Sequence, residues 1–141
     1  MNIENLTTLA YYLSGLPEGY GHFGMYNYSQ DRESRFAPIT RHECGTTACA
    51  VGHGPYAGIP IEVGEYWPDY SERVFIKGIY AREWEWCFSS SWSEVDDTAH
   101  GAAKRILYML DRGVPNDFDS VGFFSREATY TYSEEFEDYI I

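Results

Sequence analysis

Two cysteines and two histidines within twelve residues carry the clearest potential for chemistry: His42, Cys44, Cys49 and His53. A thiol at the start of a helix feels the positive end of the helix dipole and free backbone N–H groups, which lower its pKa and can stabilise an oxyanion. Cys44 is therefore the candidate nucleophile of a hydrolase or transferase, with His53 or His42 as its base. No recognisable triad motif surrounds these residues.

The same four residues are ligands that zinc accepts. Their spacing weakens a zinc hypothesis, because structural zinc sites usually use cysteine pairs about two to four residues apart. Cys44 and Cys49 are five apart and would point about 140° from each other on a helix. The alternative to both hypotheses is a buried helix of small residues, whose thiols act as compact apolar groups. We favour this alternative and expect neither a metal nor a cofactor.

Aromatic side chains joined by arginines form a third candidate site. Tyr26, Tyr28 and Trp86 could stack a base, while Arg41 or Arg73 could clamp a phosphate. Such a pocket would sequester a nucleotide-like signal. The alternative is that the tryptophans build the core. The 13 tyrosines are too many to be buried together, and exposed tyrosine is typical of recognition surfaces.

The charge of the chain points away from nucleic acids. Ten Lys and Arg residues face 22 Asp and Glu residues, which leaves a net charge of −12. Direct binding to DNA or RNA needs clusters of Lys and Arg that meet the phosphates, and the sequence has no such cluster. A partner with a basic groove would instead attract this protein from a distance. Acidity could also serve only to keep an aromatic-rich chain in solution.

The C-terminal segment, from about residue 116 to 141, concentrates the negative charge, with seven carboxylates and one arginine. Its end mixes acidic and aromatic side chains. We expect the carboxylates to imitate phosphate spacing and the aromatic side chains to act as desolvated anchors. The predicted binding residues are Tyr132, Glu134, Glu135, Phe136, Glu137, Asp138 and Tyr139.

The hydrophobic pattern predicts several helices. Apolar residues recur at helical spacing from Ile3 to Leu13, after the possible cap Asn2. The clearest helix runs over residues 98–112, with Thr98 as its cap and a glycine and a proline after its end. A further helix after Pro68 and a short one from residues 46 or 47 to Val51 complete the set.

Alternating patterns predict strands. Trp84, Trp86 and Phe88 alternate with two glutamates and a cysteine, which suits a strand or an aromatic turn, and residues 128–133 alternate in the same way. We therefore predict an α+β fold, in which a small antiparallel sheet packs with two to four helices and helix 98–112 is central. At 141 residues the chain fits a single compact domain over residues 1–141.

Motifs spread over much of the chain resemble those of small uncharacterised proteins of bacteriophages and bacteria. The resemblance covers about residues 20–116 and supplies a phage or mobile-element setting, with no activity attached. It is carried by Cys44-Gly45-Thr46-Thr47-Ala48-Cys49 with Gly52-His53, Trp86-Cys87-Phe88-Ser89 through Trp92, Asp97-Thr98, Gly101-Ala102-Ala103, Arg105-Ile106 and Gly113-Val114-Pro115.

The sequence also indicates a compartment. No apolar run approaches the roughly 20 residues that cross a bilayer. The N-terminus lacks the basic start of a signal peptide, and three cysteines, an odd number, favour reduced thiols. We expect a cytoplasmic protein without membrane contact, acting in the host cytoplasm if a phage encodes it.

These patterns favour a non-catalytic inhibitor over an enzyme. The expected partner is a host protein whose basic, nucleic-acid-binding surface is blocked, as in counter-defence or host takeover. A binder of nucleotide-like small molecules and a Cys44-dependent enzyme are the alternatives.

Overall fold

The computed structural model describes residues 1–25, 49–79, 81–116 and 118. This part of the chain is all-α, since it holds no strand beyond one isolated bridge residue, Phe23. Its elements are α1 (Ile3–Ser14), η1 (Val51–His53), α2 (Trp67–Val74), α3 (Arg82–Phe88), η2 (Ser90–Glu94) and α4 (Ala99–Arg112), where η denotes a 3-10 helix. The predicted α+β fold with a small antiparallel sheet is therefore wrong. The strand expected at residues 128–133 lies outside the described residues.

The aromatic run at residues 84–88 accounts for much of this error, because α3 occupies it. Trp84 and Phe88 are four residues apart, so the helix brings their rings together edge to face at 5.7 Å. Trp86 and Cys87 are also fully buried. A short helix with this much buried surface has an apolar pattern that periodicity alone does not distinguish from a strand.

The capped helices of the sequence prediction are confirmed. Asn2 Oδ1 accepts a hydrogen bond from Asn5 N at 2.9 Å and so caps α1. Thr98 Oγ1 accepts one from Gly101 N at 3.0 Å and caps α4. Gly113, with φ 78°, then ends α4 in a conformation that favours glycine.

The two shorter predicted helices differ in outcome. The helix after Pro68 is confirmed as α2, and the proline lies in its first turn, where its missing N–H costs no helical hydrogen bond. The short helix expected to end at Val51 is not observed in the described residues, because the 3-10 helix η1 begins at Val51 instead. Residues 46–48, where the predicted helix would begin, lie outside the described part.

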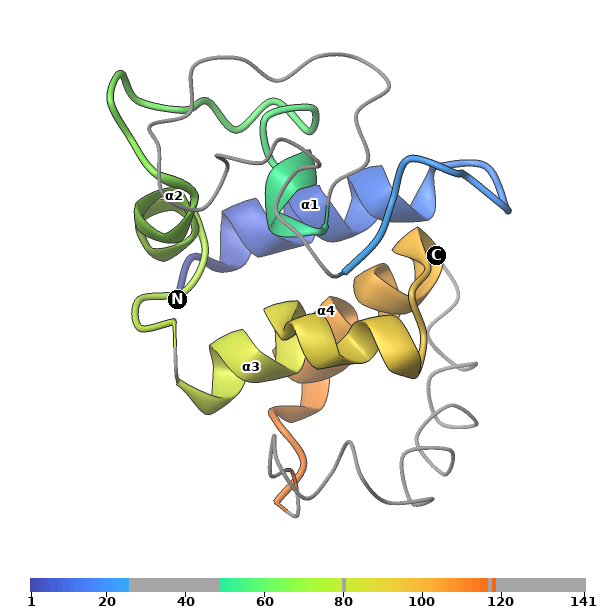
Figure 1. Ribbon diagram of the computed structural model, residues 1–141. Helices are drawn as coiled ribbons and strands as arrows, with labels where there is room; N and C mark the ends of the chain where they lie inside the picture. The colour runs from blue at the N-terminus through green and yellow to red at the C-terminus, as the bar shows by residue number, and fades with distance from the viewer. Residues whose placement is uncertain (26–48, 80, 117, 119–141) are drawn as a thin grey trace.

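The helices pack around one apolar core (Figure 1). Among the described elements, α1 packs most extensively on α4, and α3 lies against α4 as well. The C-terminal end of α2 is joined to the start of α1 by two hydrogen bonds, from Asn2 N to Phe75 O at 2.7 Å and from Asn5 Nδ2 to Val74 O at 2.9 Å. These bonds place α2 beside the N-terminal end of α1. None of the helices in the described residues is long and apolar enough to span a membrane.

Candidate functional site

A turn between η1 and α2 projects from this helical core. Glu65 N donates to Glu62 O at 3.1 Å, which closes a β-turn over residues 62–65. Gly64 has φ 80°, whereas Val63 has no positive φ, and this combination defines a type II turn with glycine at its third position. Val63 lies at the tip and is 107% exposed, so no part of the described chain covers its side chain.

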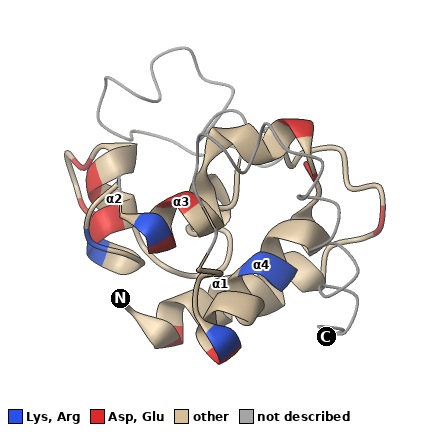
Figure 2. Ribbon diagram, turned by 90° about the horizontal axis from the view of Figure 1, so that it is seen from below, with Lys and Arg blue, Asp and Glu red and all other residues tan. Residues whose placement is uncertain are grey.

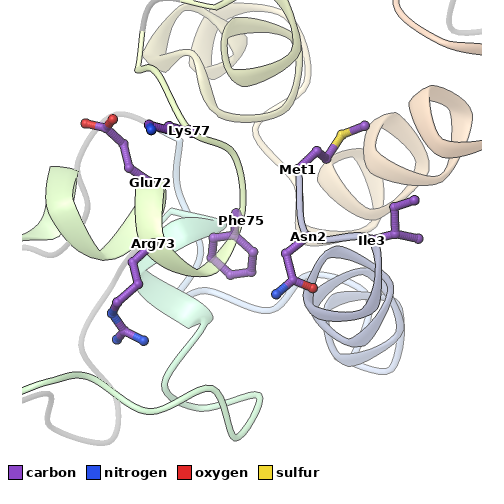
Figure 3. Close-up of a pocket in the computed structure, with 7 residues that line it drawn as sticks. All are labelled: Met1, Asn2, Ile3, Glu72, Arg73, Phe75 and Lys77. Carbon is purple, nitrogen blue, oxygen red and sulfur yellow. The ribbon is translucent and has the colours of Figure 1, made fainter.

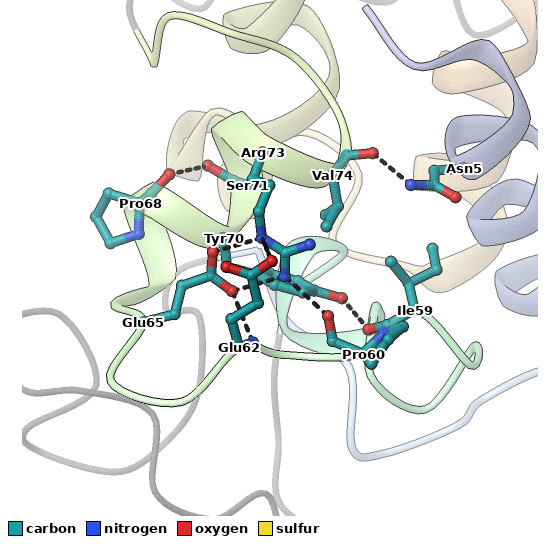
Figure 4. A network of polar contacts seen from close by, with 10 residues as sticks. All are labelled: Asn5, Ile59, Pro60, Glu62, Glu65, Pro68, Tyr70, Ser71, Arg73 and Val74. Atoms are coloured by element: carbon teal, nitrogen blue, oxygen red, sulfur yellow. Dashed lines mark hydrogen bonds and ion pairs between the residues drawn. The ribbon is translucent and has the colours of Figure 1, made fainter.

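Arg73 of α2 holds this turn in place (Figure 4). Its Nε donates to Glu65 Oε2 at 2.7 Å and its Nη2 donates to Glu65 Oε1 at 2.8 Å, which makes the pair bidentate. The same Nη2 donates to Pro60 O at 2.9 Å, two residues before the turn. The Glu65 side chain is only 8% exposed, and hydrogen bonding to the guanidinium lowers the pKa of this carboxyl. A partly buried bidentate pair of this kind is stronger and more specific in geometry than an open ion pair.

A second residue of α2, Tyr70, anchors the chain just before the turn. Its hydroxyl donates to Ile59 O at 2.6 Å, and the residue is fully buried. Tyr70 and Arg73 are three positions apart, so they lie on one side of the helix, and the guanidinium carbon of Arg73 is 5.7 Å from the Tyr70 ring centroid. We call these two residues the α2 clamp. Together they fix the chain from Ile59 to Glu65.

The C-terminal end of α2 borders an open hollow of about 460 Å³ (Figure 3). Exposed apolar side chains of the N-terminal end, Met1 and Ile3, lie on one side of it, and Arg73 and Lys77 contribute cations. Glu72 also lines the hollow, but one of its carboxylate oxygens accepts a hydrogen bond from Gly78 N at 3.1 Å. The hollow therefore has a mixed character, with no group of side chains poised for a reaction.

Carboxylates are spread around the described part of the molecule rather than gathered on one face (Figure 2). Glu62 has a side chain that is 68% exposed and lies next to the Val63 tip. The exposed acidic residues of the described part are Glu4, Glu18, Glu62, Asp69, Glu83, Glu94, Asp97 and Asp111.

The predicted thiol and metal residues fall into two groups. His42 and Cys44 lie outside the described residues. Cys49 is buried, and this burial raises the pKa of its thiol to about 11. His53 is also fully buried, and its Nδ1 donates to the carbonyl oxygen of Cys49 at 2.9 Å, since a carbonyl can only accept. Within the described part, no three potential ligands approach closely enough to hold a metal ion.

Aromatic rings enclose the His53 imidazole. The ring centroids of Tyr12, Tyr20, Phe23 and Tyr56 lie between 5.4 and 6.3 Å from it. This arrangement buries the histidine as a part of the core between the first helix and η1. It supports the interpretation of residues 49–53 as close-packed structure.

The predicted nucleotide pocket is described at only two of its residues. Trp86 is fully buried and packs against the rings of Trp92, Tyr108 and Phe118, so it has no open face on which a base could stack. Arg73 belongs to the α2 clamp. Tyr26, Tyr28 and Arg41 lie outside the described residues, as do all seven predicted binding residues of the C-terminal segment, 132–139.

Sequence reasoning missed the turn and one buried cation. The signal for the turn was Gly64 in Glu62-Val63-Gly64-Glu65, because glycine is the residue that a type II turn needs at its third position. Arg105, in contrast, falls on the buried face of α4 and is 0% exposed. Its Nη1 donates to Asp96 O at 3.2 Å, and its guanidinium carbon lies 4.3 Å from the Trp92 ring centroid.

Comparisons with known proteins add no relative: the chain matches no protein-family model, no curated protein and no solved structure. The resemblance to phage and bacterial proteins therefore stays a prediction.

Proposed function

We propose that this protein is a non-catalytic, acidic binding protein that inhibits a partner by covering its basic, nucleic-acid-binding surface. The observation that carries the proposal is the net charge of −12. Exposed carboxylates occur on the described helices and loops alike, so the negative potential surrounds this part of the molecule (Figure 2). Such a field accelerates encounters with a basic surface and disfavours acidic ones.

The two described thiols, Cys49 and Cys87, are poor nucleophiles, whereas the candidate nucleophile Cys44 lies outside the described residues. A thiolate is the nucleophilic form of cysteine, and burial raises the thiol pKa of both Cys49 and Cys87. Neither sulfur is exposed to a substrate. A phage or mobile-element origin fits this function, since an inhibitor of a host protein needs affinity and no turnover.

The first test measures capture as a function of salt. The tagged protein is immobilised, exposed to nuclease-treated lysate of its source cells, and washed at salt concentrations from about 50 to about 500 mM, over which exposed charges become largely screened. We expect a basic, nucleic-acid-binding protein to be held at low salt and released at high salt. Retention that does not change across this range would refute the proposal.

The second test locates the charge that matters. One variant neutralises the C-terminal carboxylates with Glu134→Gln, Glu135→Gln, Glu137→Gln and Asp138→Asn. A matched control neutralises four exposed carboxylates elsewhere, with Glu4→Gln, Glu18→Gln, Glu94→Gln and Asp111→Asn. We expect the C-terminal variant to lose more affinity than the control and to show a shallower salt dependence. Equal losses would remove the C-terminal segment from the mechanism.

A further inference from the structure

The turn at residues 62–65 holds an exposed aliphatic side chain in a fixed position. Isolated apolar residues are common on protein surfaces and need no explanation by themselves. Here, however, Glu65 is largely buried in order to accept two hydrogen bonds from Arg73, and the turn that this pair fixes ends in a side chain exposed at 107%. The contacts therefore stabilise the position of a tip that contributes nothing to the core.

Rigidity of this kind favours binding. A loop that is already fixed in one conformation loses little entropy when a partner immobilises it. Gly64 supplies the positive φ that the turn needs, and the carboxylate of Glu65 also accepts a hydrogen bond from Glu62 N at 3.1 Å. The turn is thus held by its own backbone, by Glu65 and by the α2 clamp.

The chemistry of the tip defines what it can enter. Val63 offers a compact branched side chain, which fits a small apolar pocket. Glu62, immediately before it, forms an ion pair with Arg73 Nε at 3.6 Å, yet its side chain is 68% exposed, so a carboxylate oxygen can still meet a cation of the partner. Asp69 on α2 is exposed too. An apolar pocket that is rimmed by Lys or Arg complements both features.

We propose that the 62–65 turn is a binding element, in which Val63 inserts into an apolar pocket on the basic surface of the partner protein while Glu62 pairs with a cation at the rim. This inference rests on the proposed function, because it takes the partner to be a basic protein. In this proposal, the contacts of Val63 and Glu62 give the complex its specificity. Long-range charge brings the partners together, and the tip then holds them in one register.

The decisive variants change the tip and leave the fold intact. Val63→Ser removes the aliphatic surface at a fully exposed position, and Tyr11→Ser is its matched control at another exposed apolar position, on α1. With the captured partner purified, we expect Val63→Ser to weaken the measured Kd at least tenfold and Tyr11→Ser to change it less than threefold, given the usual gain from burying a valine. A Val63→Ser Kd within twofold of wild type would overturn the proposal.

Two further measurements test the geometry. Arg73→Lys keeps the charge but removes the bidentate fork, so it should weaken binding by loosening the turn, while circular dichroism reports an intact helical fold. A diazirine analogue of leucine, close to valine in size, at position 63 should form an adduct with a partner peptide that contains apolar residues and Lys or Arg, and the same probe at position 11 should not. No adduct from position 63, or equal adducts from both positions, would overturn the proposal.

These results separate the two proposals. Salt-sensitive capture that is indifferent to Val63→Ser overturns the binding turn and leaves the proposed function standing. Capture that depends on Val63 but is indifferent to salt refutes the basic partner and leaves the apolar tip standing.

Discussion

Arg105→Met tests whether a buried guanidinium stabilises this core or strains it. Arg105 is fully buried on α4, and within the described residues two of its nitrogens, Nε and Nη2, have no hydrogen-bond partner. Desolvation by burial lowers the pKa of this guanidinium to about 10, although nearby Asp96 partly counters the effect. Methionine has a similar unbranched shape and carries no charge.

The expected magnitude follows from the groups that change. Desolvating an ion costs several kcal/mol, and each unsatisfied buried donor costs about 1–3 kcal/mol. Against this, Arg105 makes one hydrogen bond, worth about 1.5–3 kcal/mol for a charged donor, and a contact with Trp92 worth about 2 kcal/mol when desolvated. We expect Arg105→Met to be at least as stable as wild type, and more stable by up to about 4 kcal/mol.

Urea unfolding monitored by circular dichroism measures this difference. Lys77→Met is the control, because Lys77 is an exposed cation and its replacement should change the free energy of unfolding by less than about 0.5 kcal/mol. If Arg105→Met were less stable than wild type by more than about 1 kcal/mol, the guanidinium would be a net stabiliser and our reasoning would be wrong.

The pH dependence of the stability difference between wild type and Arg105→Met tests the same reasoning in a second way. Because the folded-state pKa of Arg105 lies below its ordinary value, the unfolded chain binds more protons than the folded one between the two values. The stability of wild type relative to Arg105→Met therefore rises as the pH increases through about 10. The advantage of methionine should shrink between about pH 8 and pH 11, and an advantage that grew over this range would contradict the assigned cause.

Three further predictions concern the core and the α2 clamp. In a Cys44→Ser background, neither Cys49 nor Cys87 should react with iodoacetamide before unfolding, because both thiols are buried with raised pKa values; rapid labelling would contradict their placement. Leu9→Ala should lower the free energy of unfolding by about 2–5 kcal/mol in urea titrations, since this side chain is fully buried on α1, and a loss below about 1 kcal/mol would argue against that packing. Glu65→Gln should be less stable than wild type by about 1 kcal/mol near neutral pH, and the difference should vanish under acid. The sign follows from the lowered folded pKa of Glu65, whose contribution is present above the unfolded pKa and is lost as the pH falls through the folded one; a difference that persisted in acid would rule out the ion pair as its source.

Local signals explain what the sequence predicted correctly. The first residue of each capped helix depends on one side chain and the backbone three positions away, and both Asn2 and Thr98 form these bonds. Gly113 and Pro68 likewise act on their own turn of the chain. Such features do not need the rest of the fold, which is why they can be predicted from sequence alone.

The failures involve tertiary contacts. Residues 84–88 form a helix because Trp84, Trp86 and Phe88 each find ring partners within the core, and their alternation carried no information on that packing. Arg105 looks like a surface cation in sequence, since arginine is rarely buried, yet α4 directs it beneath Trp92. For the turn, the glycine was visible but the long-range pair between Glu65 and Arg73 was not.

The net charge and the 62–65 turn contribute to different steps of recognition: the charge attracts basic surfaces, and the turn selects among them. A net charge of −12 attracts any basic surface, so by itself it cannot select one partner among many. Selection needs a short-range contact that rewards one shape and penalises others. A tip that is fixed by Arg73 and Glu65 can do this, because a rigid side chain that meets no pocket must push the two surfaces apart. The complex should therefore owe its association rate to the carboxylates and its lifetime to Val63.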